Sequence, residues 1–233
     1  MTNSTQKSDS RRILGGAALF VGGFLGASIV CLYQWGGTAP WSRLDLFSGG
    51  YLFLAMVLVV QQGFFARSLA FSKEKMEEAF GLSYDPGWMK RAYWLGLAEL
   101  LIFIDYGHFR LTPFLERRPL QAAGIMLMTA AIVWLGWVDR YLSRHFRDDL
   151  TQQAVMNNGP YRYIRHPRYA GLIASRIACA LILASAVAWL LAFCWVMLTL
   201  RRIRLEEPHL AGLFGQSYES YAARTPRLVP WLY

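Results

Sequence analysis

The chain has 233 residues, of which 55% are apolar, and its formal net charge is +9. The apolar residues gather in runs close to the roughly 20 residues that a helix needs to cross a bilayer, which indicates a single all-α integral membrane domain. Because the basic residues flank these runs, the charge indicates membrane topology and contact with anionic headgroups, and we expect no nucleic-acid partner.

About six transmembrane helices are expected. Residues 1–12 are polar and are predicted to be a disordered cytosolic N-terminus, and residues 13–142 form a region of four spans. The first run also has features of a cleaved signal peptide, but it lacks a clear cleavage site, so we predict a retained span. Asp85-Pro86-Gly87 predicts a turn after a polar segment with a short surface helix. The four spans are predicted at Ile13–Tyr33, Gly49–Leu69, Ala92–His108 and Pro119–Leu142.

Residues 143–233 are predicted to form a catalytic region. The largely apolar stretch Tyr169–Leu200 has 32 residues, which is too long for one ordinary span and long enough for a tight helical hairpin that breaks near Leu183–Ala186. The Lys and Arg residues concentrate on one side of this layout, so both termini are expected in the cytosol, at a bacterial inner membrane or the endoplasmic reticulum. The three cysteines lie inside apolar segments and are expected to be packing residues, without a metal site.

Two motifs flank the predicted hairpin. Residues 158–171 read Asn-Gly-Pro-Tyr-Arg-Tyr-Ile-Arg-His-Pro-Arg-Tyr-Ala-Gly, which places three arginines and one histidine within seven residues. Such a cluster is either a headgroup anchor or a site for an anionic ligand. After the hairpin, residues 206–221 read Glu-Glu-x-x-Leu-x-x-x-Phe-Gly-x-x-Tyr-x-x-Tyr, and a final Pro-Arg-x-x-Pro begins at Pro226.

In this order and spacing the two motifs resemble the isoprenylcysteine carboxyl methyltransferase and phospholipid methyltransferase superfamily of integral membrane enzymes. The resemblance covers roughly Leu150–Tyr233. It implies an S-adenosylmethionine-dependent methyltransferase whose cytosolic cofactor pocket is closed by a C-terminal helical segment. It also implies a lipidic or hydrophobic acceptor, of the prenylcysteine carboxylate or phospholipid amine type, that enters from the bilayer.

The resemblance also implies roles for individual residues. Arg202 and Glu206 match catalytic positions, and Arg202 matches a substrate-facing arginine. The chemistry agrees, because a glutamate can pair with the donor's amino group and tyrosine faces attract its sulfonium. Methyl transfer is an in-line displacement, so catalysis depends on positioning and water exclusion. The residues implied for the cofactor are Gln153, Ala154, Val155, Met156, Tyr161, His166, Pro167, Tyr169 and Glu206.

Arg176 lies two helical turns beyond Tyr169, inside the fifth predicted span, where sequences of this superfamily are usually apolar. Two interpretations stay open: a structural ion pair with Glu99 or Asp105 of the third span, or contact with an anionic group of the acceptor. Asp105 is itself a candidate base for an amine or hydroxyl acceptor.

Three alternative functions also stay open. The first is an NADPH-dependent oxidoreductase of the sterol reductase type, which shares the Arg-His-Pro-x-Tyr-x-Gly motif. Those enzymes carry Arg-Asp-Glu followed by Cys and Lys-Tyr-Gly, whereas this chain has Glu-Glu-Pro at 206–208 and Leu-Phe-Gly at 213–215. Residues 61–67 resemble the small-thiol S-methyltransferase branch of the superfamily, although this chain has a glutamine where that branch has a histidine. A transporter or scaffold would spread polar residues along several spans, whereas here they gather at one mouth.

Overall fold

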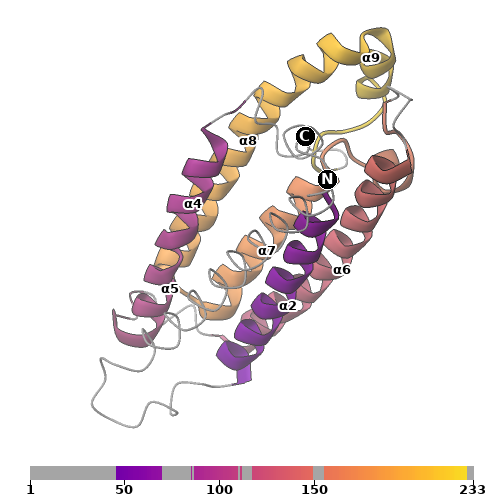
Figure 1. Ribbon diagram of the computed structural model, residues 1–233. Coiled ribbons are helices and arrows are strands. Elements are labelled where there is room, and N and C mark those ends of the chain that lie inside the picture. The colour runs from indigo at the N-terminus through magenta and orange to yellow at the C-terminus, as the bar shows by residue number, and fades with distance from the viewer. Residues whose placement is uncertain are drawn as a thin grey trace, which may run out of the picture.

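The protein is described by a computed structural model, which places residues 46–69, 85, 87–109, 111, 117–148 and 155–229. The predicted first span and residues 70–84 lie outside this part of the chain. All regular elements within it are helices (Figure 1). They are α2 (Leu46–Leu69), α4 (Trp88–Ala98), α5 (Leu100–Ile104), the π-helix η2 (Asp105–Phe109), α6 (Arg118–Asp148), the 3-10 helix η4 (Gly159–Arg162), α7 (Pro167–Leu183), α8 (Ala186–Phe214) and α9 (Gln216–Ala222).

Three stretches are long and apolar enough to cross a membrane, Leu46–Phe65, Arg118–Arg144 and Ala186–Phe214. Their outward faces carry large apolar side chains such as Met126 and Val133, which are 68% and 69% exposed. Exposed apolar surface of this kind is what lipid-facing helices present. The architecture is therefore that of an all-helical membrane protein.

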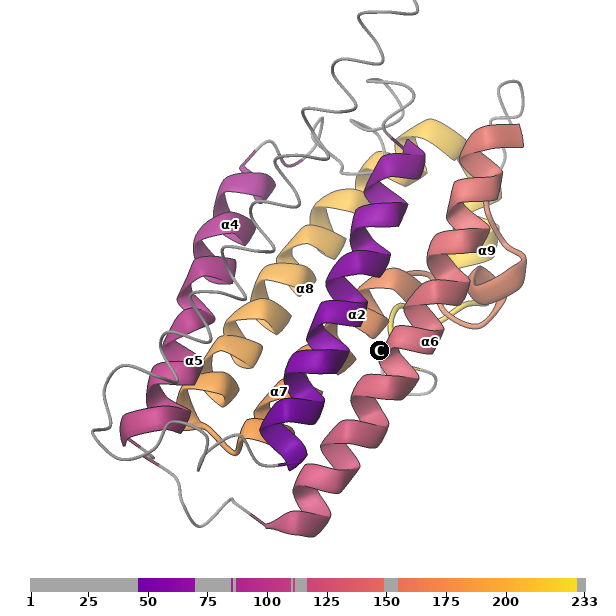
Figure 2. The same ribbon diagram turned by 60° about the horizontal axis from the view of Figure 1, so that its bottom comes forward.

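Helix α7 is the centre of the bundle. It packs against α2, α6 and α8, while α4 and α5 lie along α8 (Figures 1 and 2). Glycine permits the close approach of α6 and α7, because a Cβ added at Gly171 would lie 2.7 Å from Leu135 Cγ and one added at Gly124 would lie 2.7 Å from Ile182 Cγ1. Small residues at helix contacts are a general means of packing helices in lipid.

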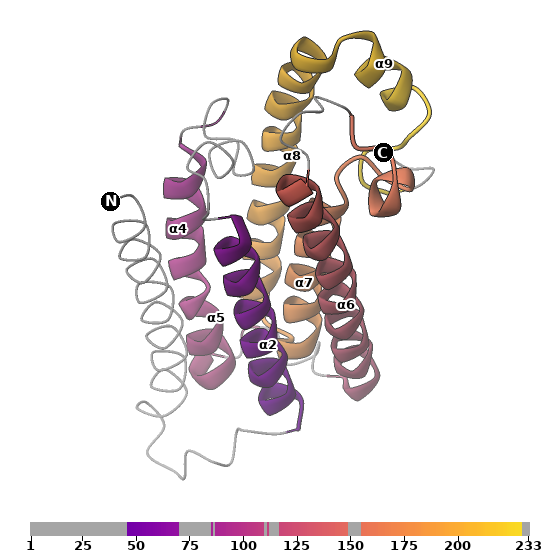
Figure 3. The same ribbon diagram turned by 45° about the vertical axis from the view of Figure 1, so that its right-hand side comes forward.

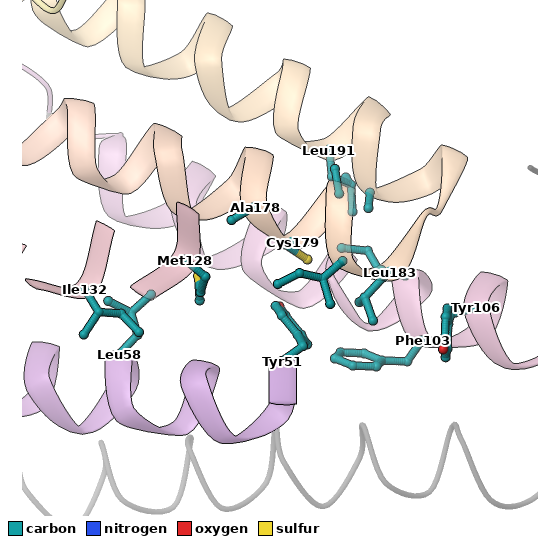
Figure 4. Packing of buried hydrophobic residues seen from close by; sticks show 14 of the residues in the cluster. Tyr51, Leu58, Phe103, Tyr106, Met128, Ile132, Ala178, Cys179, Leu183 and Leu191 are labelled. Carbon is teal, nitrogen blue, oxygen red and sulfur yellow. The ribbon is translucent and has the colours of Figure 1, made fainter. Parts of the chain in front are cut away.

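The buried core lies between these helices (Figure 4). Cys179 is buried in it with a free thiol, as expected of a packing residue. The labelled side chains come from α2, α5, η2, α6, α7 and α8: Tyr51, Leu58, Phe103, Tyr106, Met128, Ile132, Ala178, Cys179, Leu183 and Leu191.

The helix bounds differ from the predicted ones most clearly in the third segment and in α6. The third segment begins at Trp88 instead of Ala92 and is interrupted at Glu99, where α4 ends and α5 follows. Helix α6 continues to Asp148 instead of ending near Leu142, because hydropathy detects only the apolar part of a helix and misses its polar last turns. The reversal between α7 and α8 falls at Ala184, in the left-handed region with φ 48°, and Ser185, inside the predicted interval.

Candidate functional site

Three of the residues expected at the site meet where α7 begins. The hydroxyl of Tyr169, in the first turn of α7, accepts a hydrogen bond from Arg202 Nε at 2.6 Å and donates one to Glu206 Oε2 at 2.7 Å. Arg202 and Glu206 are four residues apart on α8 and therefore share one helix face. Arg202 is 2% exposed and Glu206 is half-buried. The tyrosine thus joins a buried cation to an accessible carboxylate.

His166 extends this cluster from the residue before α7. Its ring stacks on Tyr169, with centroids 5.6 Å apart and planes at 22°. Its Nε2 lies 3.4 Å from Glu207 Oε1, on the residue next to Glu206. Pro167 begins α7, and its carbonyl accepts a hydrogen bond from Trp134 Nε1 at 2.7 Å, which fixes the start of α7 against α6. His166 and Pro167 are therefore both beside Tyr169.

The two adjacent glutamates have different surroundings. Glu206 faces Tyr169. Glu207 instead forms ion pairs with Arg165 Nη1 of the motif loop at 3.2 Å and with Arg227 Nη2 of the C-terminal segment at 2.8 Å, and it also contacts His166. Glu207 is part of the Glu-Glu motif in the sequence, but its position as a shared acceptor was not predicted. The sequence signal that could have indicated this pairing was the cluster of basic residues in the first motif and the two glutamates in the second.

Backbone hydrogen bonds attach the C-terminal segment to the same loop. The amides of Arg165 and His166 donate to the carbonyls of Pro226 and Arg227 at 2.8 and 3.0 Å. The hydroxyl of Tyr221, in α9, donates to the carbonyl of Tyr161 at 2.7 Å. Figure 3 shows α9 and the segment after it returning from the end of α8 toward this loop. The segment after α8 therefore covers the loop that contains His166.

Tyr161 and Met156 lie on the α2–α6 side of the loop. Both pack against Phe65 and Leu142, and the carbonyl of Tyr161 is the acceptor for Tyr221. Removal from solvent raises the pKa of Tyr161, and the charge of Glu206 acts in the same direction, so the phenol stays neutral. Val155 is half-buried beside Met156. Gln153 and Ala154 lie outside the described residues.

Gly159 explains the shape of this loop. It has φ +57°, and a Cβ there would lie 2.6 Å from Tyr141 Cε2. Glycine adopts this left-handed conformation most readily, and the absence of a side chain leaves room for the Tyr141 ring.

Arg168 belongs to a separate polar network that joins three helices. Its Nε donates to Asp139 Oδ1 at 3.1 Å and its Nη2 to Gln62 Oε1 at 2.7 Å, while Gln62 Nε2 donates to Asp139 Oδ2 at 2.8 Å. The guanidinium also lies 4.6 Å from the ring centroid of Phe65. Arg168 thus ties α7 to α2 and α6. Sequence reasoning missed its partners, although an acid inside an otherwise apolar helix was a signal.

Arg176 forms one of the two ion pairs that were expected for it. Its Nη1 lies 3.2 Å from Glu99 Oε2, and Trp195 Nε1 donates to Glu99 Oε1 at 2.8 Å. Arg176 also stacks over Trp195, with Cζ 5.0 Å from the ring centroid. The pair joins α7 to the junction of α4 and α5.

Asp105 is placed away from the Tyr169 cluster. It accepts hydrogen bonds from the hydroxyl of Ser185 and from the amide of Leu111, the latter at 3.1 Å. Ser185 follows α7, whose 17 residues separate it from His166 by about 25 Å at 1.5 Å per residue. Asp105 therefore supports the α7–α8 turn, and its placement argues against the candidate role as a base for the acceptor at the Tyr169 cluster.

The polar and aromatic side chains of the site, within the described part of the chain, suit an organic ligand better than a metal ion. No group of three or more His, Cys, Asp or Glu side chains suited to a metal ion occurs among the residues that are placed. Glu206, Arg202 and the stacked rings of His166 and Tyr169 instead offer an anion, a cation and aromatic faces within one cluster.

This part of the chain is similar in sequence to known proteins. Residues 119–217 match the phospholipid methyltransferase family. A protein-S-isoprenylcysteine O-methyltransferase of Schizosaccharomyces pombe is 31% identical over 46% of this chain and 45% of its own length. Methanethiol S-methyltransferase 2 of Bradyrhizobium diazoefficiens is 26% identical over 62% of this chain and 61% of its own length.

A protein-S-isoprenylcysteine O-methyltransferase of Dictyostelium discoideum is 34% identical over 32% of this chain and 31% of its own length. The chain thus aligns with less than two thirds of each of these relatives. The region that matches the family contains His166, Tyr169, Arg202 and Glu206. Over this region the chain is similar to the isoprenylcysteine carboxyl methyltransferase and phospholipid methyltransferase superfamily.

Proposed function

We propose that the protein is a membrane methyltransferase that uses S-adenosylmethionine and methylates a hydrophobic acceptor at the end of the bundle where α7 begins. The observation that carries the proposal is the arrangement in which Tyr169 links Arg202 to Glu206. A buried cation beside an accessible carboxylate suits a reaction between a cationic donor and an anionic acceptor. The O- and S-methyltransferase names of the relatives support this reaction class.

The residues around Tyr169 fit the donor, which supplies an activated methyl group. Glu206 is proposed to hold the donor's amino group, since a hydrogen bond to a charged group is worth about 1.5–3 kcal/mol. The faces of Tyr169 and His166 suit the sulfonium through cation–π attraction of about 0.5–2 kcal/mol. Residues 153–156, Tyr161 and Pro167 are proposed to line the rest of this pocket, and the C-terminal segment is proposed to exclude water from it.

Arg202 favours an anionic acceptor over a cationic one. At a separation of 4 Å and an effective dielectric constant of 20, two unit charges interact by about 4 kcal/mol, which opposes an ammonium headgroup and stabilises a carboxylate. A carboxylate also needs no general base. We therefore favour the prenylcysteine carboxylate type over the phospholipid amine type. The second candidate is a small thiol, because a guanidinium also stabilises a thiolate and a methanethiol S-methyltransferase is among the relatives.

Arg176 is proposed to support acceptor binding more deeply in the bundle. It lies two turns from Tyr169 on the same face of α7, and 28% of its side chain is exposed although it pairs with Glu99. An Arg176→Gln variant is then expected to raise the KM for the acceptor. Loss of folding, with normal acceptor kinetics in the protein that remains folded, would instead assign the pair a structural role.

The membrane arrangement is part of the proposal. Six spans with α7 and α8 as a hairpin, and both termini in the cytosol, agree with the distribution of Lys and Arg. The membrane is proposed to be a bacterial inner membrane or the endoplasmic reticulum. Cysteine labelling of the two termini in sealed vesicles tests this orientation.

An activity screen tests the function. Membranes that contain the protein are incubated with methyl-labelled S-adenosylmethionine and, separately, with N-acetyl-S-farnesylcysteine, phosphatidylethanolamine or methanethiol. We expect a base-labile methyl ester on the first probe, and loss of it in Arg202→Gln but not in Arg204→Gln, a control at an exposed position of the same helix. Oxidation of NADPH by a sterol substrate without methyl transfer would favour the reductase alternative.

A further inference from the structure

We propose that Trp88, at the start of α4, is a positioning residue that holds the guanidinium of Arg202 at the acceptor side of the site. The inference deepens the proposed function and rests on it. Trp88 lies outside residues 119–217, the region that matches the family.

The contacts around Arg202 define the orientation of its guanidinium. Its Cζ lies 4.2 Å from the ring centroid of Trp88 and 5.8 Å from that of Tyr169. Its Nε also donates to the Tyr169 hydroxyl at 2.6 Å. The indole thus covers one face of the cation, while the phenol engages an edge. Since an arginine side chain has many rotamers in solution, these contacts restrict it before an acceptor binds.

Trp88 is itself held in place by residues on both sides. Its ring meets Trp195 edge to face, with centroids 6.3 Å apart and planes at 66°. Its amide donates to the carbonyl of Asp85 at 3.0 Å. Asp85 is 3% exposed and forms ion pairs with Arg91 and with Arg201, the latter at 3.6 Å. Because Arg201 precedes Arg202, the start of α4 is attached to α8 at two consecutive residues.

The other end of α4 is attached to the same face of α8. Trp195 contacts Trp88 and also donates to Glu99 at 2.8 Å. Trp88 and Glu99 are eleven residues apart, which is about three helical turns, so both side chains leave one face of the segment. Glu99 in turn pairs with Arg176 of α7. Helix α4 is therefore a fixed support that connects the Arg176 pair to the Arg202 guanidinium.

A positioning role predicts a specific kinetic signature. Without the indole, Arg202 keeps its charge but samples more orientations, so acceptor affinity falls while the donor, which is proposed to bind at Glu206, is little affected. A purely structural residue behaves differently, because its loss lowers the amount of folded protein without changing the KM for either substrate.

The test uses the full-length protein in lipid nanodiscs with methyl-labelled S-adenosylmethionine and N-acetyl-S-farnesylcysteine as probes. We expect Trp88→Leu to lower kcat/KM for the acceptor by about 10–30-fold, the size of a desolvated cation–π contact. We expect donor Kd, measured by equilibrium dialysis, to change by less than about twofold. Trp88→Phe should recover most of the loss, because phenylalanine keeps an aromatic face. Trp94→Leu is the matched control, since Trp94 is on the same helix and 61% exposed.

A double-mutant cycle with Arg202→Lys separates positioning from stability. If Trp88 acts through Arg202, adding Trp88→Leu to Arg202→Lys should reduce kcat/KM by less than about twofold more. Effects that multiply, or normal acceptor kinetics in folded Trp88→Leu and Trp88→Phe, would overturn the inference while leaving the methyltransferase proposal intact. A wild-type protein that does not bind the donor would overturn the proposed function, and this inference with it.

Discussion

Glutamine substitutions at the neighbouring residues Glu206 and Glu207 should affect different properties: donor binding at Glu206 and stability at Glu207. Glu207 lies within 3.4 Å of the guanidinium groups of Arg165 and Arg227 and of the ring Nε2 of His166. Removing one partner of a buried charge cluster costs about 3–5 kcal/mol. The contribution of Arg227 is smaller because 37% of its side chain is exposed and solvent screens it. We therefore expect Glu207→Gln to destabilise the protein by about 2–4 kcal/mol.

Glu206→Gln should instead spare stability and weaken the donor. The half-buried Glu206 accepts one described hydrogen bond, from Tyr169, and an amide oxygen can still accept it. Loss of the charge should remove about 1.5–3 kcal/mol of interaction with the donor's amino group, which is roughly a 10–100-fold increase in Kd.

Three measurements check this pair of predictions. They are the thermal midpoint in detergent, donor Kd by calorimetry, and hydrogen exchange of the amides of Arg165 and His166, which bind the C-terminal segment. Glu207→Gln should lower the midpoint and speed exchange, whereas Glu206→Gln should change only Kd. The reasoning is refuted if Glu207→Gln keeps the wild-type midpoint and protection, or if the two variants lose donor affinity equally without losing stability.

Three further substitutions test the supports of the site. Gly171→Ala places a methyl 2.7 Å from Leu135 Cγ and should destabilise the α6–α7 contact by about 1–3 kcal/mol, seen as a lower thermal midpoint; an unchanged midpoint would mean that the helices separate easily. Asp139→Ala leaves Arg168 without its carboxylate and should lower the free energy of unfolding by about 3–5 kcal/mol. Asp139→Asn should lower it by less, and denaturant unfolding of the two variants measures the difference. Asp105→Asn should lower stability but leave kcat of the folded protein unchanged, and a large fall in kcat would restore its role as a base.

Hydropathy predicted the long helices well because lipid requires uninterrupted apolar length. It also located the α7–α8 reversal, where a 32-residue stretch exceeds one span. It did not predict that the third segment begins at Trp88 or breaks at Glu99. The buried acids of this segment, Glu99 and Asp105, have partners in other parts of the bundle. The bounds of such a segment depend on tertiary pairing, which a window of local sequence does not contain.

The motifs named several residues that the structure places side by side, but not how these residues are paired. Tyr169, Arg202 and Glu206 are adjacent, as the resemblance implied. The contacts of Trp88 with Arg202 and of Glu207 with the C-terminal segment were not predictable. Each joins segments that are distant in the sequence, and their geometry depends on how α4 and the C-terminal segment pack against α8.

Binding of the methyl donor is the decisive test of the proposed methyltransferase function. Purified wild-type protein in nanodiscs is dialysed to equilibrium against S-adenosylmethionine and, in parallel, against NADPH. We expect saturable retention of S-adenosylmethionine that Glu206→Gln weakens, with no retention of NADPH. Retention of NADPH together with no uptake of S-adenosylmethionine would contradict it.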